Sequence, residues 1–361
     1  MNKKRNKRKK RNERNKPIKD MSTVKIALIT GANSGIGYGV AQRLLDHSAK
    51  NTNEQFKIVL ACRNKTRAID AQNALLKEFT GGLVEIVLVD VSSVKSVFEC
   101  CKEVKKRFNR IDLIFCNAGI LPCTHVDWSV VAKQLVFSPI ALMSRTDCIV
   151  QPVGKTTAEG LGETFACNVF GHYVMIRELE NLLIKTKNSR IIWTSSCTAT
   201  KENFNLEDYQ AIKENAPYES SKRMTDLIAI GLNSRLNKHD IYSFATHPGI
   251  AATNIVRDHL GWVMGYGMLI GLFAARTFLG MRNQTVTNWN GSYSNYYVAT
   301  QPIDLLNNAA IKKFGSYCNR FGEVYVDTDD IEDYNEVETE ALFNKLNKLL
   351  DEFRVKYNIK S

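Results

Sequence analysis

The sequence predicts an α/β fold in which one large domain is built on a doubly wound parallel sheet. From residue 23 onward, short apolar runs rich in β-branched residues alternate regularly with longer amphipathic runs. The short runs are almost continuously apolar, which is typical of strands buried on both faces of a parallel sheet. Of the 361 residues, 44% are hydrophobic and 24% are charged, which excludes a disordered, collagen-like or small disulfide-bonded protein.

The elements follow one another in the order that such a sheet requires. The apolar runs predict six strands, at residues 24–30, 56–63, 83–91, 111–119, 190–196 and 241–249. Helical periodicity predicts the connecting helices, at residues 35–48, 68–79, 94–108 and 217–236, with a further helix around Asn168. We assign residues 21–330 to one domain and residues 331–361 to an amphipathic C-terminal helix that packs on it.

Two apolar segments interrupt this alternation. Residues 120–158 form an insertion after the fourth strand and include the apolar run 130–143. Residues 260–281 carry no charge before Arg276, and the stretch before it is shorter than the ~20 residues of a spanning helix. A spanning segment, an interfacial anchor, a lid over an apolar pocket and a buried core helix all remain open. We expect this part of the fold to face a membrane.

The basic character of the chain is confined to its N-terminus. Residues 1–20 hold eleven Lys and Arg against Glu13 and Asp20, a net charge of +9 out of +12, which leaves +3 for the rest. Charges this dense repel one another, so we expect a disordered tail. A nuclear address, an RNA contact, attachment to anionic lipid and a dispensable extension before Met21 remain open. The nearly neutral body does not predict a nucleic-acid-binding surface.

Cysteine and histidine usage points away from disulfides and metals. The nine cysteines form an odd set without a C-x-x-C pair, and several lie in apolar runs. This pattern predicts reduced thiols in a protein that faces the cytosol. Six scattered histidines predict no metal site.

The loop after the first predicted strand has the spacing of a dinucleotide-binding turn. It reads TGANSGIG and places Gly31, Gly35 and Gly37 between a strand and a helix, with Ser34 and Ile36 at the helix start. Glycines there allow the backbone to approach a pyrophosphate, whose charge is favoured at a helix N-terminus. The turn therefore predicts a Rossmann-type sheet that binds a dinucleotide, and a purely structural turn is the alternative.

The ends of the next strands indicate which dinucleotide binds. No acidic residue follows the second strand to hold a ribose 2′-hydroxyl, and Arg63 instead offers a guanidinium to a 2′-phosphate. Asp90 ends the third strand, where it can accept from the adenine amino group. Asn117, Ala118 and Gly119 end the fourth and lie where backbone meets the adenosine ribose. We therefore predict NADP(H) as the cofactor.

The reacting residues are predicted to be Ser196, Tyr218 and Lys222. Tyr218 and Lys222 are four residues apart on a predicted helix and share one face. The spacing predicts that the Lys222 ammonium lowers the pKa of the Tyr218 phenol, which donates a proton to a carbonyl oxygen as hydride arrives at its carbon. Ser196 is expected to hydrogen-bond the same oxygen, with Ser195 as the alternative.

With these residues in place, the sequence resembles the short-chain dehydrogenase/reductase family over about residues 23–330. The resemblance implies two further roles: Asn168 supports a water chain that resupplies Lys222 with protons, and Thr253 contacts the nicotinamide carboxamide. It rests on motifs in the order of that family, namely TGANSGIG, Asp90-Val91, Asn117-Ala118-Gly119, Asn168, TSS (194–196), YESSK (218–222) and HPG (247–249).

A narrower resemblance, to the 3-keto-steroid reductases (also called 17β-hydroxysteroid dehydrogenase type 7), is carried by GKTTAEGLGETFACNVFGHYVMIRELENLL, RIIWTSS, ENFNLEDYQ and PYESSKRMTDL. It implies reduction of a steroid ketone, most directly the C3 ketone of a sterol biosynthesis intermediate, with 17-keto steroids as a second substrate class. It also implies association with the cytoplasmic face of the endoplasmic reticulum membrane. The wider family implies a homodimer through the helices that carry Asn168 and Tyr218.

Two alternatives to a steroid ketone reductase stay open. An enzyme of the same fold can act on retinoids or other lipid carbonyls, since apolar insertions suit any of these substrates. A cofactor-binding scaffold without turnover is the second, although the complete Ser, Tyr, Lys and Asn set argues against it.

Overall fold

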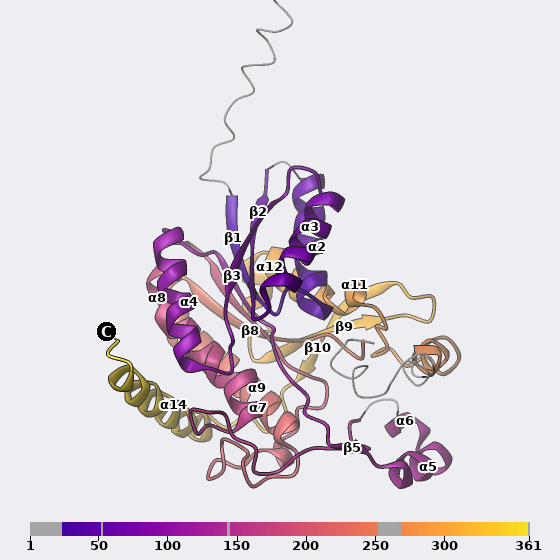
Figure 1. Cartoon of the computed structure of the whole chain (residues 1–361). Helices are drawn as coiled ribbons and strands as arrows, with labels where there is room; N and C mark the ends of the chain where they lie inside the picture. The colour runs from indigo at the N-terminus through magenta and orange to yellow at the C-terminus, as the bar shows by residue number, and fades with distance from the viewer. Residues whose placement is uncertain (1–23, 52, 143–144, 252–266, 268, 360–361) are drawn as a thin grey trace, which may run out of the picture.

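The computed structural model describes residues 24–51, 53–142, 145–251, 267 and 269–359. Its centre is an eight-stranded sheet that is parallel except at one edge, where the last strand runs antiparallel (Figure 1). This confirms the predicted doubly wound sheet. From edge to edge the strands are β10 (Val324–Asp330), β9 (Lys312–Cys318), β8 (Ile241–His247), β7 (Ser189–Thr194), β4 (Leu113–Cys116), β1 (Val24–Thr30), β2 (Gln55–Cys62) and β3 (Leu83–Leu88).

Helices cover both faces of the sheet and enclose two hydrophobic cores. One face carries α2 (Gly35–Lys50), α3 (Lys65–Glu78), α11 (Asn288–Gly291), α12 (Tyr293–Thr300) and α13 (Ile303–Asn307). The other carries α4 (Val94–Arg107), α7 (Glu163–Phe165), the π-helix η2 (Ala166–Phe170), α8 (Gly171–Leu183) and α9 (Pro217–Leu236). Short 3-10 turns, η3 (Lys201–Asn203) and η4 (Asn237–His239), flank α9.

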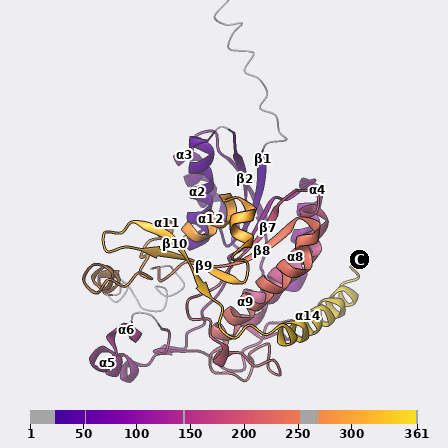
Figure 2. The same ribbon diagram turned by 180° about the vertical axis from the view of Figure 1, so that it is seen from behind.

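The last helix, α14 (Glu336–Lys356), lies along α8 and α9 (Figure 2). Its apolar stripe, which includes Leu342, Phe343 and Leu346, is buried in the second core. Polar contacts fix its register as well, since the Tyr173 hydroxyl of α8 donates to Asn347 at 2.6 Å. A dimer through the outer faces of α8 and α9 would therefore require α14 to move away.

The insertion at residues 120–158 forms a small subdomain outside the main sheet. A hairpin of β5 (His125–Val126) and β6 (Ile149–Val150) carries α5 (Trp128–Phe137) and α6 (Pro139–Leu142). All ten residues of α5 are described, and none of them is buried. An apolar helix that packs so little on its own chain has its hydrophobic side chains in contact with solvent.

The second apolar segment lies only partly within the described residues. Residues 269–279 are helical, and Ile270, Phe278 and Leu279 are exposed there. The rest of 260–268, apart from Gly267, lies outside the description, as do the basic tail at 1–20 and Thr253. Within the described ranges, no helix is both long enough and apolar enough to cross a bilayer.

Candidate active site

The glycine turn after β1 is packed tightly against the loop that follows β4. A side chain at Gly37 would place its Cβ 2.5 Å from the Asn117 Nδ2 and 2.8 Å from the Gly31 carbonyl oxygen. Gly31 has φ +66°, and a Cβ there would lie 3.0 Å from Ala118 Cα. The Asn117 amide donates to the Thr30 carbonyl at 2.9 Å and joins the two loops. The glycines are therefore required by close backbone approach.

This turn leads into the N-terminus of α2, where Ser34 is the N-cap residue. No side-chain cap is made there within the described residues, and the first turn carries no acidic residue. The positive end of this sixteen-residue helix is therefore open to an anion, as a pyrophosphate requires. Ile36, just inside the helix, is buried and fixes its start against the body.

The predicted adenosine contacts lie together at the ends of β2 and β3. Arg63 Nη1 is 3.7 Å from Asp90 Oδ2, and the Arg63 side chain is 77% exposed. Asp90 is fixed by Ser92, whose hydroxyl donates to it at 2.6 Å. The guanidinium is thus anchored near a carboxylate while most of its donors face solvent, an arrangement that suits a 2′-phosphate.

Asn168 lies in the π-helix η2, an irregularity that is frequent at functional sites. Its buried amide accepts from the Ile120 N–H at 2.8 Å, and donates to the Ile120 carbonyl and to Ser221 at 3.0 Å each. Next to it, a Cβ on Gly119 would lie 3.1 Å from Asn168 Oδ1 and 3.9 Å from Lys222 Nζ. The ends of β4, η2 and α9 therefore meet at this point.

Ser196, Tyr218 and Lys222 converge at the end of β7. The Ser196 hydroxyl hydrogen-bonds the Tyr218 phenol, while the Ser195 hydroxyl donates to the Lys222 carbonyl at 3.2 Å. Lys222 Nζ donates to the Thr194 carbonyl at 2.8 Å and lies 5.5 Å from the centre of the Tyr218 ring. Of the two serines, Ser196 is the one whose hydroxyl faces the phenol.

Burial dominates the proton affinities of this pair. It raises the pKa of the Tyr218 phenol above its ordinary value of 10, with the Glu219 carboxylate acting in the same direction. The lowering predicted from the Tyr–Lys spacing is therefore wrong for this structure, because removal from water outweighs the hydrogen bond with Ser196, which lowers the pKa. Burial also lowers the pKa of Lys222 to about 8, against the opposing charges of Cys167 and Asp226.

Comparisons with known proteins identify the family of this chain. The family model described as short chain dehydrogenase matches residues 25–262. The chain belongs to the short-chain dehydrogenase family. It is therefore an oxidoreductase that acts between alcohol and carbonyl with a nicotinamide cofactor.

Individual relatives span most of this dehydrogenase. The human protein 3-keto-steroid reductase/17-beta-hydroxysteroid dehydrogenase 7 is 38% identical over 92% of the chain and 95% of its own length. The 3-keto-steroid reductase erg27 of Schizosaccharomyces pombe is 28% identical over 93% of the chain and 99% of its own length. Among solved structures, salutaridine reductase from Papaver somniferum has a TM-score of 0.55 at 17% identity, covering 78% of this chain and 97% of that one. That likeness supports the fold.

In this dehydrogenase the insertion is hydrogen-bonded to the start of α9, the helix that carries Tyr218 and Lys222. Gln151 accepts from the Tyr218 backbone N–H at 2.9 Å and donates to the Glu219 carboxylate at 2.7 Å. Thr146 hydrogen-bonds the other Glu219 oxygen. Gln151 therefore caps α9 from outside the helix, at the residue that carries the phenol. These contacts could not be predicted from the sequence, because no local pattern links residues so far apart in the chain.

Asp226 and Lys313 were also not predicted from the sequence, and they lie next to Ser196. Lys313 Nζ donates to the Ser196 carbonyl at 2.8 Å and to Asp226 Oδ2 at 2.7 Å. The one signal in the sequence is the spacing of Tyr218, Lys222 and Asp226, four residues apart along one stripe of α9.

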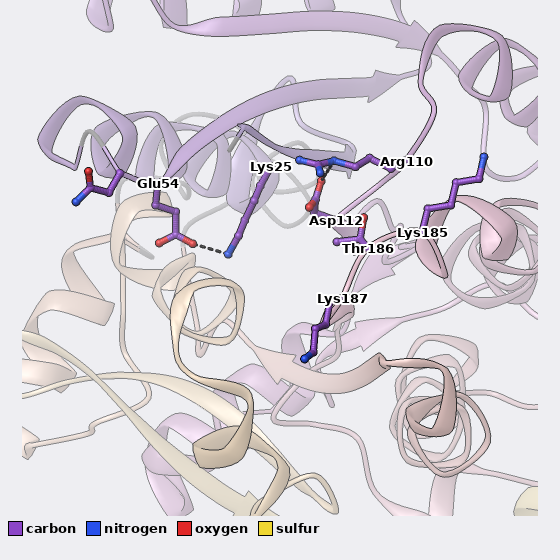
Figure 3. Close-up of a pocket in the computed structure, with 8 residues that line it drawn as sticks. Lys25, Glu54, Arg110, Asp112, Lys185, Thr186 and Lys187 are labelled. Carbon is purple, nitrogen blue, oxygen red and sulfur yellow. Dashed lines mark hydrogen bonds and ion pairs between the residues drawn. The ribbon is translucent and has the colours of Figure 1, made fainter. Parts of the chain in front are cut away.

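A cavity of about 440 Å³ lies at the other end of the strands from Ser196, Tyr218 and Lys222 (Figure 3). It opens at the amino ends of the strands, where Lys25 pairs with Glu54 and Arg110 with Asp112. Ligands of open α/β sheets bind outside the carboxyl ends of the strands. We therefore place the active site at the carboxyl ends of the strands, away from this cavity.

Proposed function

We propose that this dehydrogenase reduces a steroid ketone with NADPH, most directly the C3 ketone of a sterol biosynthesis intermediate, and that it also accepts 17-keto steroids. The reaction is supported by one observation above all: Ser196, Tyr218 and Lys222 converge at the end of β7, where Lys222 also meets the loop after β4 that packs on the glycine turn. The substrate is supported by the names of relatives that match over more than nine-tenths of the chain.

The residues present fit the cofactor. We assign the pyrophosphate to the uncapped start of α2 with Gly31, Ser34, Gly35, Ile36 and Gly37, where a side chain at Gly31 or Gly37 would clash with the loop after β4. The adenosine half is assigned to Arg63, Asp90, Asn117, Ala118 and Gly119, and the nicotinamide ribose to Tyr218 and Lys222. Thr253 is assigned to the carboxamide. When bound, the nicotinamide supplies the hydride that attacks the carbonyl carbon.

The chain's own residues manage the proton. Because burial raises the pKa of Tyr218, its phenol stays protonated at neutral pH and can donate to the carbonyl oxygen. The Ser196 hydroxyl lies beside the phenol and hydrogen-bonds the same oxygen as negative charge develops on it. Lys222 stabilises the resulting phenolate. Asn168, which hydrogen-bonds both backbone groups of Ile120, supports the water chain that returns a proton.

A panel of carbonyl compounds tests the substrate class. NADPH oxidation is measured with a 3-keto sterol, a 17-keto steroid and retinal, using detergent-supported protein. We expect the highest kcat/KM with the 3-keto sterol. A preference for retinal would favour the lipid carbonyl alternative, and NADPH binding without turnover of any of the three would favour the scaffold.

The Arg63→Ala variant tests the choice of cofactor. Loss of a charge-assisted contact to the 2′-phosphate is expected to raise the Kd for NADPH by roughly 10–100-fold. The Kd for NADH should change less than twofold, because NADH lacks that phosphate. Fluorescence titration measures both. Arg67→Ala, which removes the same charge from the neighbouring helix α3, is the control, and an equal loss there would contradict the assignment.

The pKa of Lys222 predicts an alkaline limit to activity. Its ammonium form stabilises the phenolate, and that form is lost as the pH rises through the lowered pKa of about 8. We therefore expect kcat to be level below that pH and to fall about tenfold per pH unit well above it. A pH profile of single-turnover rates measures this. A rate that stays level to pH 10 would contradict the role of the ammonium.

We propose further that the dehydrogenase contacts the cytoplasmic face of the endoplasmic reticulum membrane through an apolar rim. The rim is supported by exposed side chains of α5, α6 and the helical segment 269–279. The ribbons of these helices lie toward the same side of the molecule (Figures 1 and 2). Large exposed apolar surfaces mark contacts with proteins or membranes. Its residues are Trp128, Leu135, Val136, Phe137, Ile140, Ile270, Phe273, Phe278 and Leu279.

Vesicle flotation tests this contact. Phe137, 78% exposed on α5, and Val355, 79% exposed on the distant α14, make a matched pair. Phe137→Glu is expected to reduce binding to phosphatidylcholine vesicles at least tenfold, because a carboxylate must be desolvated to enter the interface. Val355→Glu should bind as the wild type does. Equal losses in both variants, or a wild type that does not float, would contradict the proposal.

A further inference from the structure

A buried ion pair connects three elements of the active site. Lys313 projects from β9 and Asp226 from α9, and their side chains are only 6% and 1% exposed. The Lys313 ammonium donates to Asp226 at 2.7 Å and to the backbone carbonyl of Ser196 at 2.8 Å. One cation therefore joins β9, the helix that carries Tyr218 and Lys222, and the turn that carries Ser196.

Other bonds hold the same turn from different directions. The Ser195 N–H donates to the Thr246 carbonyl of β8 at 2.7 Å, and the Ser195 hydroxyl donates to the Lys222 carbonyl. Thr198 closes the turn by donating its N–H to the Ser196 hydroxyl oxygen at 3.1 Å. Lys313 adds the side-chain contact to the Ser196 carbonyl, so it acts on the residue whose hydroxyl faces the phenol.

A gain in folding stability alone does not explain why the chain buries this ion pair. Two charges removed from water are often no more stabilising than well-packed apolar side chains of similar volume. A lysine ammonium, however, offers several donors from one point and can bridge a carboxylate and a carbonyl that belong to different elements. The Asp226 Oδ1 atom is buried without a partner among the described residues, so this carboxylate is committed to Lys313 through its other oxygen.

We propose that Lys313, held by Asp226, is a positioning residue that fixes the Ser196 turn against the catalytic helix. This role rests on the proposed reduction and adds residues that do not touch the substrate. Misplacement of a reacting group by about 1 Å can lower a rate ~100-fold. The contact between the Ser196 hydroxyl and the Tyr218 phenol depends on the relative placement of two elements that Lys313 ties together.

The test removes both charges at once, because a single substitution would leave an unpaired buried charge. The Lys313→Met/Asp226→Asn variant keeps the side-chain shapes and deletes the bridge. Lys312→Met/Asp330→Asn is the matched control, since Lys312 is the next residue on β9 and pairs with Asp330 at 3.0 Å at a more exposed place.

Two readouts distinguish positioning from a merely structural role. Hydrogen exchange of the peptide that covers residues 194–200 reports the order of the turn without needing turnover. The kinetic readout is kcat on the pH-independent plateau, together with the isotope effect for deuterated NADPH. For the double variant we expect faster exchange in this peptide, kcat lowered ~10–100-fold, a larger isotope effect and a Kd for NADPH within about twofold of the wild type. The control should keep kcat within about threefold.

The outcomes separate this inference from the proposed function. Unchanged exchange and an unchanged isotope effect in a folded double variant would overturn the positioning role, whatever its melting temperature. An equal loss in the Lys312→Met/Asp330→Asn control would overturn it too, because that variant keeps the bridge to Ser196. If the wild type proves inactive while the double variant still loosens the turn, the positioning contact stands and the proposed reaction fails.

Discussion

The Tyr218→Phe variant is expected to lower kcat by ~10²–10⁴-fold while NADPH binding stays within about twofold of the wild type. The substitution removes one oxygen atom and with it the proton that the phenol donates. The ring itself is retained in its half-buried position between Ser196 and Lys222. The fold should therefore be unaffected. Single-turnover NADPH oxidation measures the rate, and tryptophan fluorescence titration measures cofactor affinity.

The control for this variant is Tyr242→Phe, on β8. Tyr242 is also half-buried, and it points away from the catalytic helix in the opposite core. Its loss of a hydroxyl should leave kcat within about twofold. Equal rates in the wild type and Tyr218→Phe would contradict the assignment of Tyr218 as the acid.

The Lys222→Met variant is expected to lower kcat/KM by ~10²–10³-fold and to weaken NADPH binding as well. The ammonium is assigned two tasks, stabilising the phenolate and holding the nicotinamide ribose, so both parameters should change. The melting temperature, unlike the activity, should not fall. Burial lowers the pKa of Lys222 to about 8, which means that the folded chain holds this charge unfavourably.

An apolar side chain of similar length should therefore leave the melting temperature of Lys222→Met unchanged or slightly raised, despite the lost bond to the Thr194 carbonyl. Differential scanning fluorimetry measures it. Lys105→Met, on α4 and far from the site, serves as the control for loss of a lysine and should keep full activity. A Lys222→Met variant with wild-type kcat/KM would remove Lys222 from the mechanism.

Local pattern was sufficient for most of the sheet. The six predicted strands lie within a few residues of their observed bounds, because each is a buried apolar run flanked by turns. Strands β9 and β10 were not predicted. Their sequences, KKFGSYC and VYVDTDD, mix charges with apolar residues, and they pair only because the sheet brings them together at its edge.

The site shows the same division between local and distant information. Residues in short motifs, such as the glycine turn and Tyr218 with Lys222, could be found from spacing alone. Lys313 and Gln151 could not, because their partners lie 117 and 67 residues away along the chain. The sequence pattern also could not predict that the pKa of Tyr218 is raised, because residue spacing indicates a neighbouring charge and carries no information about burial.

The most direct test of the proposed function follows the hydride itself. Wild-type protein is incubated with a 3-keto sterol and NADPH that carries deuterium at the reactive position of the nicotinamide, and the product is analysed by mass spectrometry. We expect a 3-hydroxy sterol with one deuterium at C3, formed by the wild type and absent with Tyr218→Phe. A product without deuterium, or a 3-keto sterol left unchanged while NADPH binds, would contradict it.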